Sequence, residues 1–71
     1  MTNPWPLERG WMAAYFTDHA AYADAMTIRS CRHMATYSKD RREFGWQLRF
    51  PARCREAVER CLRRERRKAR G

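Results

Sequence analysis

Large apolar residues occupy every second position between residues 44 and 50, and this alternation is the clearest pattern in the chain. A period of two is typical of a strand with one buried face. We therefore predict a strand that ends at Pro51, because proline disfavours helical backbone at the residue before it. The apolar side consists of Phe44, Trp46, Leu48 and Phe50, and the outward side consists of Gly45, Gln47 and Arg49.

A second apolar pattern follows Pro51 and has the spacing of a helix, since apolar residues recur three and one positions apart as far as Leu62. Beyond Leu62 this side of the helix carries no large apolar residue, and four pairs of like charges stand four residues apart. The helix dipole favours cations there, but the pairs repel one another, so we expect fraying unless an anionic partner orders the segment. The chain is thus divided into a small globular domain, 1–62, and a basic C-terminal extension, 63–71. The apolar stripe is formed by Cys54, Ala57, Val58, Cys61 and Leu62.

The N-terminal part is predicted to be helical. Leu7, Trp11, Ala14 and Tyr15 have the spacing of one helix face, and prolines are tolerated in a first turn. Thr17 or Asp18 would cap a second helix over 20–26, although one longer helix is also possible. The segment 27–37 is ambiguous: its first part favours helix, whereas residues 34–37 suit pairing with the later strand.

These elements predict an α+β fold. It has one or two N-terminal helices, a strand or short hairpin near 34–50, and a C-terminal amphipathic helix with a basic tail. The alternative is a small all-α bundle in which 38–50 is partly helical. A single core in a chain of 71 residues supplies roughly 3–5 kcal/mol. A homo-oligomer would bury more surface, and the oligomeric state stays open.

The charge is strongly positive, with 16 basic and eight acidic residues and a net charge of +8. Residues 53–70 hold nine basic and three acidic side chains, which gives +6 for this segment alone. Such a patch favours polyanions, namely DNA, RNA or an anionic membrane surface. The chain has no apolar run of membrane-spanning length and no secretory leader pattern, so we expect a cytoplasmic protein with reduced thiols. The stripe past Leu62 is too poor in apolar residues to favour membrane binding.

The sequence shows no enzyme signature, and we expect a protein without catalysis, cofactor or metal. The three glycines stand singly, so no phosphate-cradling loop is present. Cys54 and Cys61 are seven residues apart, about 10.5 Å along a helix, which is too far for a disulfide or a shared zinc ion. Cys31 and His33 do not form a recognised ligand pair. The cysteines are therefore interpreted as packing residues.

The segment WQLRFPARCREAVERCL, residues 46–62, resembles the opening of Arc-type ribbon-helix-helix repressors. In that family a short alternating strand pairs across a dimer and sends its outward side chains into the major groove. The resemblance implies that Gln47 and Arg49 face DNA and that Pro51 opens the helix. Gly45 departs from the family, which usually has a base-reading side chain there. The second helix of the family is absent, and a long segment precedes the strand.

Two function classes are expected. The first is a small nucleic-acid-binding protein, such as a DNA-binding regulator from a phage or mobile element, with DNA or RNA as partner. The second is a small phage-type inhibitor or adaptor of the anti-defence or anti-CRISPR kind, which would bind a host protein or nucleoprotein complex through exposed aromatic anchors. These anchors would come from Trp5, Trp11, Tyr15, Phe16 and Tyr22. The predicted nucleic-acid-binding residues are Gln47, Arg49, Arg63, Arg64, Arg66, Arg67, Lys68 and Arg70.

Overall fold

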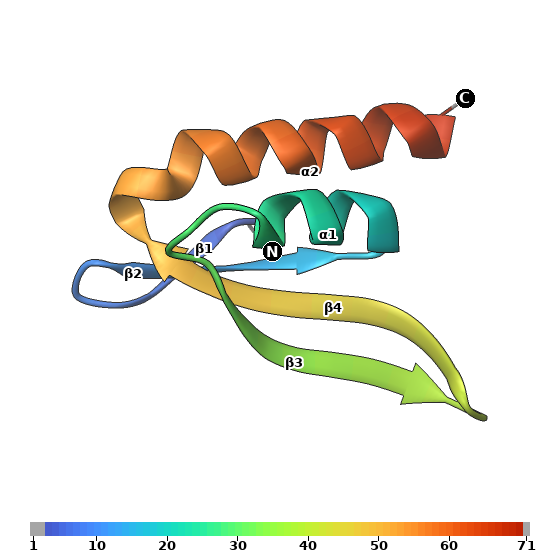
Figure 1. Ribbon diagram of the computed structural model, residues 1–71. Coiled ribbons are helices and arrows are strands. Elements are labelled where there is room, and N and C mark those ends of the chain that lie inside the picture. The colour runs from blue at the N-terminus through green and yellow to red at the C-terminus, as the bar shows by residue number, and fades with distance from the viewer. Residues whose placement is uncertain (1–2, 71) are drawn as a thin grey trace.

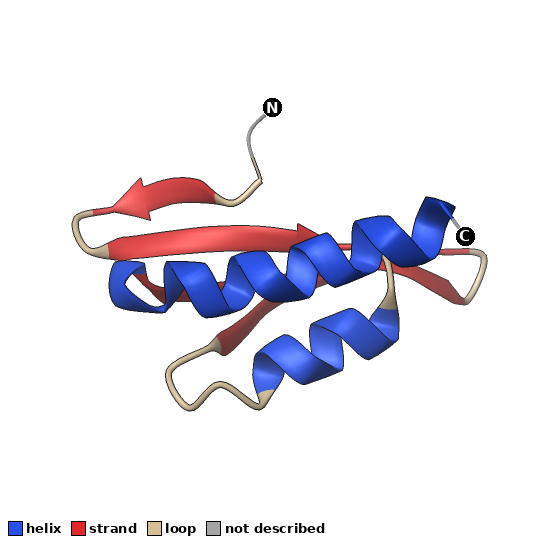
Figure 2. Cartoon of the chain, turned by 90° about the horizontal axis from the view of Figure 1, so that it is seen from above, coloured by secondary structure: helices blue, strands red, loops and turns tan. Residues whose placement is uncertain are grey.

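The protein consists of one four-stranded antiparallel sheet with two helices on one of its faces (Figure 1). The computed structural model describes residues 3–70, and it describes side chains as far as residue 68. The sheet order is β1-β2-β4-β3, so the last strand in sequence lies inside the sheet. Seen from above, both helices lie in front of the sheet (Figure 2). The elements are β1 (Trp5–Glu8), β2 (Trp11–Phe16), α1 (His19–Met26), β3 (Arg32–Lys39), β4 (Arg42–Pro51), the 3-10 turn η1 (Ala52–Cys54) and α2 (Arg55–Arg70).

The predicted α+β class with a C-terminal helix agrees with this architecture, but the expected N-terminal helix is wrong. Residues 5–16 form the β1–β2 hairpin instead, which turns at Gly10 with φ of +79°. Both sides of β2 carry apolar residues, so the alternation that marks a half-buried strand is absent. The side chain of Asn3 extends this pairing. Its Nδ2 donates to the Tyr15 carbonyl oxygen at 2.8 Å, and its Oδ1 accepts from the Tyr15 N–H at 3.0 Å.

The predicted helix capped near residue 18 is confirmed as α1. The Asp18 side chain accepts a hydrogen bond from the Ala21 N–H at 3.2 Å, which satisfies one of the unpaired donors of the first turn. The helix ends at Met26, and the backbone N–H of Thr27 closes its last turn. The ambiguous segment 27–37 therefore divides into a short loop and most of β3, and the predicted pairing of 34–37 with the later strand is confirmed.

Strand β4 was predicted from its alternation, and it is the longest strand in the described part of the chain. It pairs with β2 on one side and β3 on the other. Trp46, Leu48 and Phe50 are buried beneath the helices, as expected. Phe44 is not, because the β3–β4 register shifts between the pairs Tyr37–Gly45 and Ser38–Glu43. This bulge turns Phe44 to the other face, where it is 50% exposed.

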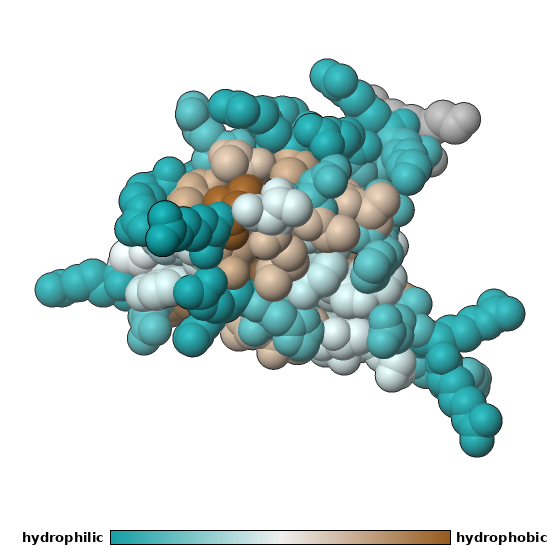
Figure 3. Space-filling model, viewed as in Figure 1, coloured by the Kyte–Doolittle hydropathy of each residue, from teal (hydrophilic) through white to brown (hydrophobic). Residues whose placement is uncertain are grey.

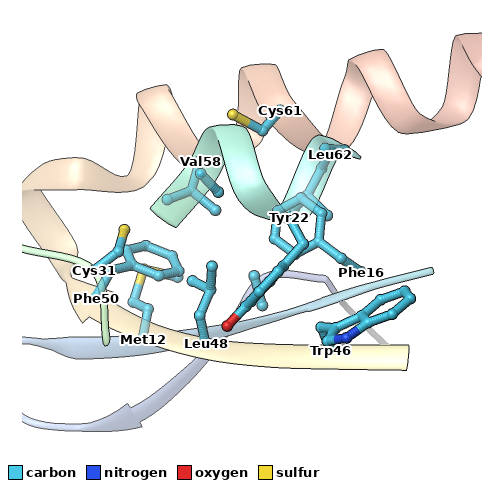
Figure 4. Close-up of a cluster of buried hydrophobic side chains, with 13 residues drawn as sticks. Met12, Phe16, Tyr22, Cys31, Trp46, Leu48, Phe50, Val58, Cys61 and Leu62 are labelled. Carbon is cyan, nitrogen blue, oxygen red and sulfur yellow. The ribbon is translucent and has the colours of Figure 1, made fainter. Parts of the chain in front are cut away.

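The core fills the single layer between the helices and the sheet (Figure 4). The largest fully buried side chains are Phe16, Leu48, Phe50 and Val58, which come from β2, β4 and α2. Burying a side chain of this size stabilises the fold by roughly 1.5–3 kcal/mol. The opposite face of the sheet has no helix over it in the described structure, and we call it the open face (Figure 1).

Helix α2 continues past Leu62 to Arg70, and contacts within the fold that the sequence did not predict reach this part. One Glu65 carboxylate oxygen accepts hydrogen bonds from the backbone N–H groups of Thr17 and Asp18, at 2.6 and 2.7 Å. Arg64 forms an ion pair with Asp24 at 2.7 Å, and Lys68 lies 3.7 Å from Asp18. These long-range contacts bind the basic segment to the start and the outer side of α1.

Candidate nucleic-acid interface

The structure separates the predicted binding residues into two groups on opposite sides of the molecule. Gln47 and Arg49 project from β4 onto the open face, as the alternation predicted. The basic residues after Leu62 lie on α2, in the helical layer (Figure 1). In the space-filling view, hydrophilic side chains project from the helical layer and from the far end of the β3–β4 hairpin (Figure 3). A single strand of nucleic acid cannot contact both groups without passing around an edge of the sheet.

Aromatic side chains gather on the open face around Gln47. We call Trp5, Tyr15, Tyr37 and Phe44 the aromatic platform; with Gln47 they line a shallow hollow of about 320 Å³. The rings of Tyr15 and Tyr37 meet edge to face, with centroids 5.7 Å apart. Tyr37 and Phe44 are 43% and 50% exposed, so part of each ring is open to solvent. The platform was missed in the sequence because its members come from four strands, three of which the sequence did not clearly show.

Gln47 is half-buried and anchored within this platform. Its Oε1 accepts a hydrogen bond from the Tyr37 hydroxyl at 2.8 Å, and its Nε2 lies 3.1 Å from the Met34 sulfur. Met34 reaches this face because the β3–β4 register also shifts between His33 and Ala35. Since sulfur is a weak acceptor, the Gln47 amide keeps donor capacity for a ligand above the sheet.

Arg49 is exposed and lies two residues further along β4 on the same face. Its guanidinium carbon is 5.4 Å from the centre of the Trp11 ring, within the range of a cation–π interaction. Arg32, its register partner on β3, lies at the edge of the sheet. At this end a second hollow of about 290 Å³ opens, and we call it the arginine hollow. Its lining residues are Gly10, Trp11, Ser30, Arg32, Pro51 and Arg53.

The basic residues of α2 do not form one surface. Arg60, Arg63, Arg64 and Arg67 line a shallow depression of about 270 Å³ on the outer side of the helix, and we call it the α2 basic face. Arg66 does not line this depression; it lines another one with Asn3, Leu62 and Glu65. Arg64 and Lys68 already face carboxylates of α1. The Arg70 side chain lies outside the described residues.

Two of the five aromatic residues expected as exposed anchors belong to the core. Phe16 is fully buried and Tyr22 is 9% exposed. Their rings meet edge to face in the core, with centroids 6.2 Å apart. Trp5, Trp11 and Tyr15 are half-buried and lie on the open face or its rim. The five aromatic residues expected as anchors are thus divided between the core and the open face.

The cysteines are placed as packing groups. Cys31 and Cys61 are buried, and Cys54 is half-buried at the start of α2. Burial raises the pKa of the Cys31 thiol to about 11, and the neighbouring Cys54 and Cys61 add to this shift. Burial likewise raises the pKa of Cys61. Within the described residues, no three histidine, cysteine or carboxylate side chains are grouped so that they could hold a metal ion.

No protein family, no curated protein and no solved structure matches this chain. The likeness of residues 46–62 to ribbon-helix-helix repressors therefore stays a prediction. The helices in the described part of the chain are too short or too polar to span a membrane.

Proposed function

We propose that this chain is a small non-enzymatic nucleic-acid-binding protein. The observation that carries the proposal is the open sheet face, where the aromatic platform, Gln47 and exposed arginines lie together. Aromatic rings on such a surface stack with bases, and amide and guanidinium groups bind base edges and phosphates. The surface therefore offers the two kinds of contact that nucleic-acid ligands require.

The α2 basic face supports the same proposal from the other side of the molecule. Arg63 and Arg67 are exposed and stand one helical turn apart, beside Arg60 and Arg64. Like charges this close repel one another, and a phosphate backbone relieves that repulsion. Contacts of this kind add affinity but carry no sequence information.

A salt series tests the proposal. The full chain is titrated with a fluorescent single strand, a duplex DNA and a duplex RNA at salt concentrations from 20 to 300 mM. We expect affinity to fall steeply with salt, because each phosphate contact contributes about 0.7 to the logarithmic slope for single strands and about 0.9 for duplex DNA. Absence of binding to all three probes at 20 mM salt would refute the proposal.

A second candidate, a small inhibitor or adaptor that binds a host protein, is favoured by the apolar part of the open face. Met34 and Phe44 are 43 and 50% exposed, and half-exposed apolar and aromatic side chains are typical anchors of protein interfaces. Affinity purification with and without nuclease separates the two candidates. A stoichiometric partner that is retained after nuclease treatment favours the protein-binding function.

A further inference from the structure

Three arginines from separate parts of the chain converge at one end of the open face. Arg32 and Arg49 are direct register partners on β3 and β4, and like charges in that position destabilise a sheet. Arg53, from η1, lines the arginine hollow together with Arg32. None of the three ion pairs found in the described part of the chain involves these arginines. The fold thus concentrates positive charge here, which favours the binding of an anion.

The guanidinium groups of Arg32 and Arg53 are held in place by neutral partners. Arg32 donates from Nη1 to the carbonyl oxygens of Arg29 and Cys31, at 3.0 and 3.2 Å. Arg53 donates from Nη2 to the Ser30 hydroxyl at 3.2 Å. A guanidinium has five N–H donors, so each arginine keeps several for a ligand. The partners orient the two side chains without reducing their charge.

The walls of the arginine hollow are also fixed. The backbone N–H of Ala52 donates to the carbonyl oxygen of Gly10 at 2.9 Å, which ties η1 to the β1–β2 turn. The N–H of Cys31 donates to the Ile28 carbonyl oxygen at 3.0 Å and closes the loop that carries Ser30. No atom lies within 4 Å of the place where a side chain on Gly10 would begin, so the hollow is open on this side. Its volume of about 290 Å³ leaves room for a phosphate group.

The arginine hollow and the aromatic platform belong to one surface. Gln47 lines the platform, and Arg49, two residues away along the same strand and about 7 Å further on, borders the hollow. Glu8 stands opposite Trp11 in the β1–β2 pair and is the carboxylate that a ligand would meet at the rim. A strand of nucleic acid that follows β4 would therefore pass from aromatic rings to arginines.

We propose that the arginine hollow binds a phosphate group of single-stranded nucleic acid, and that bases further along the same strand, about 20 Å away beside β4, stack on the exposed rings of Tyr37 and Phe44. This assignment rests on the proposed function and names its ligand class. Single strands are selected because only unpaired bases present a free face to a ring, whereas the bases of a duplex are stacked on each other. Arg32 and Arg53 hold the phosphate, and Arg49 links the hollow to the platform.

The test compares variants on opposite sides of the molecule. Arg32→Gln with Arg53→Gln removes two charges from the hollow, and Arg63→Gln with Arg67→Gln removes the same charge from the α2 basic face for comparison. Phe44→Ala removes the most exposed ring of the platform. Each protein is titrated with a labelled 12-nucleotide oligo-dT, the same length of oligo-U and a 12-base-pair duplex, over a salt series. Circular dichroism confirms that each variant is folded.

We expect the hollow variant to lose at least tenfold in affinity for both single strands at 50 mM salt, and to reduce the logarithmic salt slope by about 0.7, the contribution of the one phosphate that Arg32 and Arg53 hold. Phe44→Ala should lose at least fivefold for single strands while its duplex affinity changes less than twofold. The α2 variant should lose affinity for single strands and for the duplex to a similar degree, because its phosphate contacts do not involve the bases.

Three outcomes would overturn the inference. If the hollow variant binds single strands like the parent protein while the α2 variant loses binding, the phosphates bind to α2, and the proposed function survives without the sheet site. If light scattering shows a dimer that Phe44→Ala dissociates, the open face is covered by a second copy of the chain. If no probe binds the parent protein at 20 mM salt, the proposed function itself fails.

Discussion

The ring of Tyr15 lies over Gly45 and occupies the place where a side chain on that residue would be. A side-chain carbon placed on Gly45 would come within 2.5 Å of Cε2 and Cζ of that ring and would overlap its hydroxyl. Tyr37, the register partner of Gly45, meets Tyr15 edge to face. The glycine therefore provides the space in which the two tyrosines of the aromatic platform come together. Its position, which departs from the ribbon-helix-helix pattern, has a packing role in this fold.

Gly45→Ala should destabilise the protein by about 1–3 kcal/mol, because the Tyr15 ring must move from a closely packed position. In a domain of this size each kcal/mol corresponds to a fall in Tm of about 4–8 °C. Urea unfolding and thermal melts measure the change. Adding Tyr15→Ala supplies the control: the double variant should lose less than the sum of the single losses, since the clash no longer exists. Strict additivity would show that Tyr15 is not the obstacle.

Arg41→Gly should stabilise the β3–β4 hairpin by about 0.5–1 kcal/mol. Asp40 and Arg41 form its two-residue turn and both have positive φ, 53° and 66°. A residue with a side chain is strained in this conformation, and Asp-Gly is a preferred pair for such turns. Thermal unfolding measures the gain. The adjacent Arg42→Gly, inside β4, should destabilise instead, and an equal effect of both substitutions would contradict the explanation.

Glu65→Gln should cost about 1–2 kcal/mol of stability. The Glu65 carboxylate accepts two backbone hydrogen bonds, from Thr17 and Asp18, and bonds to a charged acceptor are stronger than neutral ones. Glu59→Gln is a matched control, because its partner Arg55 is 3.4 Å away on an exposed helix surface, where such pairs contribute less than about 0.5 kcal/mol. Equal losses in urea unfolding would show that Glu65 does not hold α2 to α1.

The cysteine thiols should make stability fall as the pH rises from about 9 to about 11. The pKa of Cys31 is raised by burial from about 9 to about 11, so over this range the native state keeps a proton that the unfolded state has lost. This contribution to stability is complete below pH 9 and is lost as the pH rises through 11. Urea unfolding across this range measures the effect. Cys31→Ser removes this thiol and should flatten the dependence relative to the parent protein.

The same burial predicts the order of thiol reactivity. At pH 8 a thiol reagent should modify Cys54 first, because it is half-buried, whereas Cys31 and Cys61 are buried. The two buried thiols should react only as fast as the protein opens. A count of rapidly modified thiols in the native state measures this, and rapid modification of all three would contradict the described core.

Strand β4 and a helix after Pro51 were predictable because their signals are local, although α2 itself begins only at Arg55, after the 3-10 turn η1. The alternation of residues 46–50 and the proline after it depend on nothing outside the segment. The β1–β2 hairpin was not predictable in this way. Both faces of β2 are apolar, and the positions of Leu7, Trp11 and Tyr15 happen to match a helix as well as a strand. The pairing of β2 with β4, which is distant in sequence, decides between helix and strand here, and the residues of 5–16 alone do not reveal it.

The candidate site was predicted in part. The outward direction of Gln47 and Arg49 followed from alternation, and the structure places both on the open face. The two bulges that bring Met34 and Phe44 to the same face leave no clear signal in the sequence, because a bulge is defined by the partner strand. Arg32 and Arg53 were counted only as charge, since their meeting depends on how β3 and η1 approach each other.

The single layer of helices also affects how the protein tolerates change. Val58 and Leu62 of α2 pack on one side of the sheet, whereas Met34, Tyr37, Phe44 and Arg49 extend from the other side into solvent. Substitutions at these exposed positions leave the helix–sheet core intact, so selection can alter what the open face recognises at little cost in folding. Gly45 is different, because any side chain there would displace Tyr15. We therefore expect evolution to change the ligand preference of the open face readily while Gly45 itself is retained.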